Sequence, residues 1–212
     1  MTEVAASSRK RSSVEVRDAK RKLPAERRDE LLTKAVEVAA TEGLSAVTLR
    51  RVAADLGVTP GLVSHYFSSA EQLIIAAFRT AAVADLAAAR ACIDAAEGPV
   101  EKMAALMDYV LDDSSDDASA LWLEAWSLGR RNAPLAVEAK GLTDEWLVCI
   151  ADIVRTGVAD GAFRVDDVDV AARRLLTMID GLGAQKVVRA VPVDEAKHIA
   201  RAYFASELGV SR

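Results

Sequence analysis

Residues 48–67 constrain the fold more than any other part of the chain, because they predict two short helices joined by a tight turn. Thr48 suits the N-cap of the first helix, since its hydroxyl can accept a hydrogen bond from an N–H of the first turn. Gly57 stands where a helix end favours positive φ, and Thr59 and Pro60 suit the start of the second helix. Each helix has an apolar face with spacings of three and four, formed by Leu49, Val52, Ala53 and Leu56 and then by Leu62, Val63, Tyr66 and Phe67.

The spacing of small and apolar residues in this segment is typical of a helix-turn-helix. Ala53 lies four residues before Gly57 and lets the helices approach, and Val63 lies six residues after it and closes their contact. The outer side of the second helix would then be free to enter the major groove of DNA. An αα-hairpin inside any helical protein could show the same apolar pattern, and this is the alternative. The residues on the outer side are small or able to form hydrogen bonds: Thr59, Gly61, Ser64 and His65.

The same stretch resembles a known family. Residues 28–78 are similar to the DNA-binding domain of the TetR family of bacterial regulators, in a pattern that includes Glu42-Gly43, Val52-Ala53, Leu56-Gly57-Val58, Tyr66-Phe67 and Leu73. The run 58–67 is most similar to the BetI-like branch of that family. Two features depart from the family pattern: Ala70 replaces a common basic residue, and tyrosine is absent at 64 and 65.

The resemblance implies that these helices contact double-stranded DNA. It implies that Thr48, Arg51 and Tyr66 contact phosphates, while the second helix meets base edges. It also implies a homodimer on a near-palindromic operator, with the two recognition helices about 34–36 Å apart. The residues expected to contact DNA are Thr48, Arg50, Arg51, Thr59, Pro60, Gly61, Ser64, His65 and Tyr66.

The chain is expected to be all-α and to divide into three parts. Residues 1–22 are predicted to form a disordered basic arm, which either reaches DNA or is a solvated tail. Residues 23–70 are predicted to form the helix-turn-helix domain. Residues 71–212 are predicted to form a helical ligand-binding and dimerisation domain. The first helix is predicted over Pro24–Glu42. A capping box of Ser68 and Glu71 is predicted to open a fourth helix that runs to Gly98-Pro99.

Family members pair through their last two long helices, and the resemblance implies the same here. Each residue expected at this interface could equally belong to the core of a single chain. The residues are Leu175, Leu176, Ile179, Leu182, Ile199, Tyr203 and Phe204.

The C-terminal domain is also expected to hold a small-molecule pocket. Trp122 and Trp126 lie four residues apart and share a helical face. With Trp146 and either Glu124 or a nearby aspartate, they could form an aromatic cage for a cationic amine. Ordinary core packing explains the same pattern and stays open as the alternative. The residues expected to bind a ligand are Met103, Met107, Trp122, Trp126, Trp146 and Met178.

Charge and composition agree with a regulator. The net charge is −5, yet residues 1–80 hold 13 Lys and Arg against 10 Asp and Glu, so a basic region precedes an acidic one. Two distant cysteines and the lack of a long uncharged apolar run favour a cytoplasmic protein outside the membrane. No P-loop, dinucleotide fingerprint or nucleophile elbow is present, so neither an enzyme nor a cofactor is expected.

These features predict a repressor that a small-molecule effector releases from its operator. The alternative is a DNA-binding helical dimer without ligand control.

Overall fold

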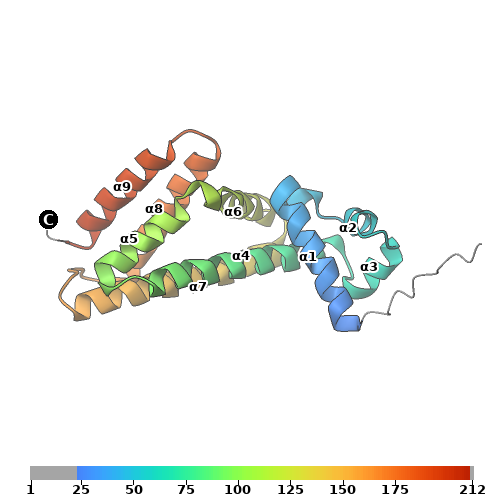
Figure 1. Ribbon diagram of the computed structural model, residues 1–212, viewed down its shortest axis with the longest axis horizontal. Helices are drawn as coiled ribbons and strands as arrows, with labels where there is room; N and C mark the ends of the chain where they lie inside the picture. Colours follow the sequence, from blue (N-terminus) through green and yellow to red (C-terminus); the bar gives the residue numbers. More distant parts are fainter. Residues whose placement is uncertain (1–22, 211–212) are drawn as a thin grey trace, which may run out of the picture.

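The computed structural model describes residues 23–210, and every regular element in that range is helical. Figure 1 shows an elongated molecule with a small group of helices at one end, the head, and a larger helical body at the other. The helices are α1 (Pro24–Glu42), α2 (Leu49–Asp55), α3 (Pro60–Tyr66), α4 (Ala70–Asp94), α5 (Gly98–Val110), α6 (Asp116–Gly129), α7 (Ala133–Ala159), α8 (Val168–Val187) and α9 (Val193–Glu207), with short 3-10 turns η1 (Leu44–Ala46) and η2 (Asp113–Ser115).

The head is built from α1, α2 and α3, and its helices begin where the sequence predicts. Thr48 accepts a hydrogen bond from the N–H of Arg51 at 3.0 Å, and Thr59 accepts one from the N–H of Leu62 at 3.3 Å. Gly57 has a φ of 63°, which turns the chain sharply between α2 and α3. These contacts confirm the helix-turn-helix.

The start of α4 differs from the prediction by one residue. Ser69, and not Ser68, is the N-cap, and its hydroxyl accepts from the N–H of Gln72 at 3.1 Å. The side chain of Gln72 turns back to the N–H of Ser68 at 2.9 Å, so Glu71 takes no part in the cap. The helix ends at Asp94, before Gly98-Pro99, and these two residues form the first turn of α5 instead.

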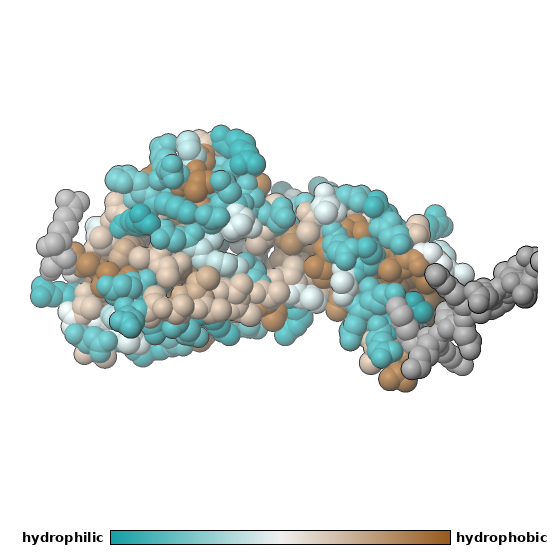
Figure 2. Space-filling view, viewed as in Figure 1, coloured by the Kyte–Doolittle hydropathy of each residue, from teal (hydrophilic) through white to brown (hydrophobic). Residues whose placement is uncertain are grey.

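Helix α4 connects the head to the body, and it is the helix among the described residues whose length and composition would allow it to cross a membrane. Apolar core helices of soluble proteins pass the same test. Here α4 packs against α1, α5, α6 and α7. A band of moderate hydropathy crosses the body in Figure 2 along the course of α4, where alanines such as Ala84, Ala87, Ala88 and Ala91 are exposed.

The core of the head extends into the body. Leu31, Val52 and Val63 form one cluster with Phe78 of α4. The same cluster is completed by residues of α6 and α7, namely Leu121, Ala125, Leu135, Ala139 and Leu142. A second cluster fills the far end of the body, between α5, α7, α8 and α9. The two halves of the molecule therefore share packed side chains at their junction.

Candidate DNA-reading face and ligand pocket

Helix α3 presents an exposed outer face at the end of the molecule remote from the C-terminus (Figure 1). Val63 is fully buried against the head, which turns the opposite side of the helix to solvent. On that side the hydroxyl of Ser64 donates to the carbonyl of Gly61 at 3.0 Å, and the rings of His65 and Tyr66 meet edge to face. The exposed residues of this face are Thr59, Pro60, Gly61, Ser64 and His65, with Tyr66 half-buried beside them.

The arginines near α3 differ in whether their charge is paired with a carboxylate of the same chain. The guanidinium of Arg51 lies 2.5 Å from a carboxylate oxygen of Glu42 and 3.1 Å from one of Asp55, so its charge is already paired. These carboxylates raise the pKa of Arg51. Arg50 is exposed on α2, and Arg28 lies over the ring of Phe67 at 5.0 Å. Arg51 must leave its partners before it can contact a phosphate.

A cavity of about 60 Å³ lies in the body between α4, α6, α7 and α8. One water needs about 10–15 Å³ by this measure, so the space suits a small organic molecule. Trp122 and Trp126 from α6 and Trp146 from α7 line it. The rings of Trp122 and Trp126 lie 5.7 Å apart, and Trp126 is 37% exposed and marks the outer edge.

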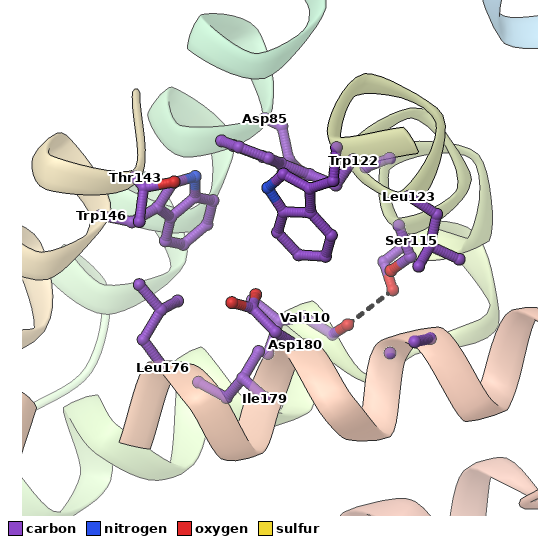
Figure 3. Close-up of a pocket in the computed structure, with 15 residues that line it drawn as sticks. Asp85, Val110, Ser115, Trp122, Leu123, Thr143, Trp146, Leu176, Ile179 and Asp180 are labelled. Atoms are coloured by element: carbon purple, nitrogen blue, oxygen red, sulfur yellow. Dashed lines mark hydrogen bonds between the residues drawn. The ribbon is translucent and has the colours of Figure 1, made fainter. Parts of the chain in front are cut away.

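Asp180 on α8 supplies a carboxylate to this cavity. Figure 3 shows the carboxylate pointing into the space between Trp122 and Trp146. It forms no hydrogen bond or ion pair with any residue that the structure describes, and burial raises its pKa to about 6. An ionised group in this position lacks a counter-ion, which a bound cation would supply.

Asp85 on α4 lies at another wall of the cavity. Its carboxylate accepts a hydrogen bond from the hydroxyl of Tyr109 at 2.8 Å. Burial raises the pKa of Asp85, and the hydrogen bond from Tyr109 partly opposes the rise. Polar groups of Ser115 and Thr143 also line the cavity. The pocket thus combines three tryptophans and aliphatic side chains with a few polar groups, as small-molecule sites usually do.

The structure separates the residues that the sequence grouped as ligand-binding. The three tryptophans come together around the cavity, whereas Met103 and Met107 are fully buried in the body core and Met178 packs at its margin. None of the methionines lines the cavity. Glu124 lies outside it and contacts the head, so the carboxylates of the pocket are Asp85 and Asp180. Neither aspartate stands out in the sequence, because only the packing of four helices brings them to the tryptophans.

The residues expected at a dimer interface are mostly covered by the chain itself. Leu175, Leu176, Ile179, Leu182 and Phe204 belong to the body core, and Leu176 and Ile179 also line the cavity. On α9, Ile199 is 38% exposed and Tyr203 is half-buried. These last two are the members of the predicted set that remain accessible.

Among the described residues no cluster of three or more potential metal ligands occurs. Cys92 and Cys149 are both free thiols, the first exposed and the second buried. The predicted basic arm at residues 1–22 lies outside the described residues.

Comparison with known proteins agrees with this geometry. Residues 31–77 match the family described as bacterial regulatory proteins, tetR family, and residues 99–209 match the BetI-type transcriptional repressor C-terminal family. The chain is 30% identical over 173 residues to the HTH-type transcriptional regulator BetI of Rhizobium meliloti, covering 79% of this chain and 81% of that one. It is 31% identical over 166 residues to the HTH-type transcriptional repressor KstR2 of Mycolicibacterium smegmatis, covering 71% and 74%.

A solved structure resembles the whole molecule. It is a putative transcriptional regulator from Saccharomonospora viridis in complex with choline, with a TM-score of 0.78, 26% identity, and coverage of 89% of this chain and 100% of that one. The helix-turn-helix, the helical body and both family matches lead to one conclusion: the chain belongs to the TetR family of DNA-binding transcriptional regulators and carries a BetI-type C-terminal domain.

Proposed function

We propose that this regulator is a dimeric repressor that binds its operator through α3 and releases it when a small cationic amine enters the pocket of the body. The observation that carries the proposal is the carboxylate of Asp180, which lies in a cavity walled by Trp122, Trp126 and Trp146. The KstR2 and BetI relatives named above support the repressor and regulator roles.

The chemistry of the pocket favours a quaternary or tertiary ammonium ion. The face of an indole ring attracts a cation, and the attraction reaches about 2 kcal/mol when the cation is desolvated. A quaternary ammonium cannot donate hydrogen bonds from its nitrogen, so aromatic faces and a carboxylate suit it better than hydroxyl or carbonyl acceptors. The similar protein from Saccharomonospora viridis was solved with choline, a ligand of this class.

The DNA end of the proposal depends on the small residues of α3. Gly61 and Pro60 lack long side chains, so the start of α3 can approach the bases closely, while Ser64 and His65 can form hydrogen bonds with base edges. The N–H groups at the starts of α2 and α3 favour phosphate oxygens. We infer a homodimer in which α8 and α9 of two chains meet, with Ile199 and Tyr203 among the contacts. The protein acts as a regulator and not as an enzyme, in the cytoplasm.

Choline is the probe that tests the ligand-binding part of this proposal. Titration of the full chain with choline, followed by tryptophan fluorescence, is expected to give saturable binding that Asp180→Asn weakens at least about tenfold. Asp152→Asn, at an exposed aspartate on α7, serves as the matched control and is expected to bind as the wild type does. Equal affinity in wild type and Asp180→Asn would contradict the proposal.

A DNA-binding dimer without ligand control is the second candidate. The two are separated by measuring the affinity for an operator duplex, selected from a random library, with and without choline. A ligand that releases DNA must lose affinity for the protein by the same factor when DNA is bound. Saturating choline that leaves operator affinity unchanged would favour the second candidate.

A further inference from the structure

Helix α6 meets both the pocket and the head, and one hydrogen bond marks its contact with the head. The carboxylate of Glu124 accepts from the backbone N–H of Leu44, with 2.5 Å between N and Oε2. Leu44 is the first residue of η1, the turn between α1 and α2. We infer that Glu124 is the positioning residue through which ligand binding in the pocket moves the DNA-binding head. This inference rests on the proposed function.

Gly43 makes the room that this contact requires. The residue has a φ of 90°, and a Cβ atom added to it would lie 2.5 Å from Oε1 of Glu124. The carboxylate therefore occupies the space that a side chain at this position would take. A hydrogen bond from a backbone N–H to an ionised carboxylate is stronger than one between neutral groups. It fixes η1 against α6 by a directional contact, in addition to the apolar packing nearby.

The spacing on α6 places Glu124 and the tryptophans on different sides of the same helix. Trp122 lies two residues before Glu124 and Trp126 two residues after it. Residues two apart on an α-helix point in nearly opposite directions, whereas residues four apart share a face. Trp122 and Trp126 accordingly line the cavity while Glu124 reaches the head. A displacement of either indole ring is carried by the helix to Glu124.

Contacts with α8 hold the first turn of α6 in place. A displacement of α6 is therefore expected to move the part of the helix beyond this turn. The ammonium of Lys186 on α8 lies 2.7 Å from Oδ1 of Asp116, the first residue of α6. Close to it, a Cβ atom on Gly183 would lie 3.2 Å from Oγ of Ser119, so α6 and α8 approach closely there. A cation that enters between α6 and α8 is expected to move the part of α6 beyond this turn. Glu124 then draws η1 with it and tilts α2, whose N-cap Thr48 is separated from η1 by Val47 alone.

Glu124→Ala in the full-length chain tests the inference. Operator affinity is measured with and without choline, and choline affinity is measured separately. In wild type the ratio of the two operator affinities is expected to fall in the usual range of about 5- to 150-fold. In Glu124→Ala it is expected to fall below about 2-fold, with choline affinity in the absence of DNA changed by less than about 2-fold. Glu124→Gln, whose side-chain oxygen can still accept from Leu44, is expected to restore part of the ratio.

Glu138→Ala is the matched control, because it removes an ion pair between α7 and Arg79 of α4 and leaves the head contact intact. It is expected to keep the wild-type ratio. A wild-type ratio in Glu124→Ala would overturn the inference, as would an equal loss in Glu138→Ala.

A measurement without ligand separates this inference from the proposed function. Hydrogen exchange at the Leu44 amide is expected to accelerate in Glu124→Ala and not in Glu138→Ala, together with a change in operator affinity in Glu124→Ala alone. If wild type fails to bind choline, the proposed ligand class is wrong. In that case faster exchange with altered operator affinity still supports Glu124 as the residue that positions the head, and unchanged exchange overturns it.

Discussion

The ammonium of Lys186 lies 2.7 Å from the carboxylate of Asp116, and at 1% exposure it is one of the most deeply buried charges in the described part of the chain. The ammonium donates hydrogen bonds to the hydroxyl of Ser115 at 3.1 Å and to the carbonyl of Asp112. The lysine thus ties α8 to the turn before α6. The polar run 112–117 is therefore in part held inside the molecule.

Removal of the aspartate from this pair is expected to destabilise the fold strongly. Asp116→Ala leaves Lys186 buried without its counter-charge, so the free energy of unfolding in urea should fall by about 3 kcal/mol. Arg189→Ala is the matched control, because Arg189 lies 3.3 Å from the same carboxylate but is 75% exposed. It should cost under about 1 kcal/mol, as exposed ion pairs do. Similar losses in both variants would contradict the assigned role of Lys186.

Asp180 makes stability and ligand binding depend on pH. Burial raises its pKa from 3.8 to about 6, so ionisation of this group opposes folding. Its contribution to stability is therefore fully present below about pH 4 and is lost as the pH rises through about 6. Asp180→Asn should raise the free energy of unfolding at pH 7.5 by about 1–3 kcal/mol and change it little at pH 4.

Choline binding should depend on pH in the direction opposite to stability, because choline binds the ionised form of Asp180. Its affinity for wild type is expected to fall by up to about tenfold per pH unit below pH 6, and to be flat over this range in Asp180→Asn. Calorimetric titration at several pH values measures the choline affinity of wild type and of Asp180→Asn. A flat profile in wild type would show that Asp180 does not face the cation.

Trp126 is the aromatic wall that can be removed with least harm to the core, because it is partly exposed at the edge of the cavity. Trp126→Leu keeps an apolar side chain and removes the indole face. Choline affinity is expected to drop by about 3- to 10-fold, which corresponds to the loss of one cation–π contact of about 1 kcal/mol. Thermal unfolding of the apo protein should change little, and an unaltered choline affinity would remove Trp126 from the site.

Arg51 offers a test of how its two carboxylate partners limit DNA binding. In Glu42→Gln with Asp55→Asn the guanidinium is free to contact a phosphate. The plot of log operator affinity against log salt concentration should then steepen by about 0.9, the value for one added phosphate contact. Adding Arg51→Ala to that variant should return the slope to its original value. If the slope stays steep, the change comes from the lost acidic charges and not from Arg51.

The sequence predicts the head well because its determinants are local. Thr48, Gly57 and Thr59 act within a few residues of their own positions, so α2 and α3 begin where the caps indicate. The start of α4 was placed one residue early because Ser68 and Ser69 are both suitable caps, and only the path of the chain selects Ser69.

The pocket depends on contacts that the sequence does not display. Trp122 and Trp126 share a face by spacing alone, but Asp180 comes to them from α8, which is distant in the sequence and packs against α6. Glu124 is one of the two kinds of acidic partner that the sequence offers for the tryptophans, because it is near them in the chain. Its position on the helix turns it toward Leu44 instead. Met103 and Met107 lie in the core and Met178 packs at its margin, which the spacing of these residues in the sequence does not reveal.

The apolar side chains that α6 and α7 add to the core of the head bear on how such proteins can be recombined. A graft of residues 23–70 onto a foreign sensor would uncover the surfaces that Leu121, Ala125, Leu135, Ala139 and Leu142 now seal. A working chimera has to bring these partners along, or redesign them, so the natural unit of exchange is larger than the helix-turn-helix alone.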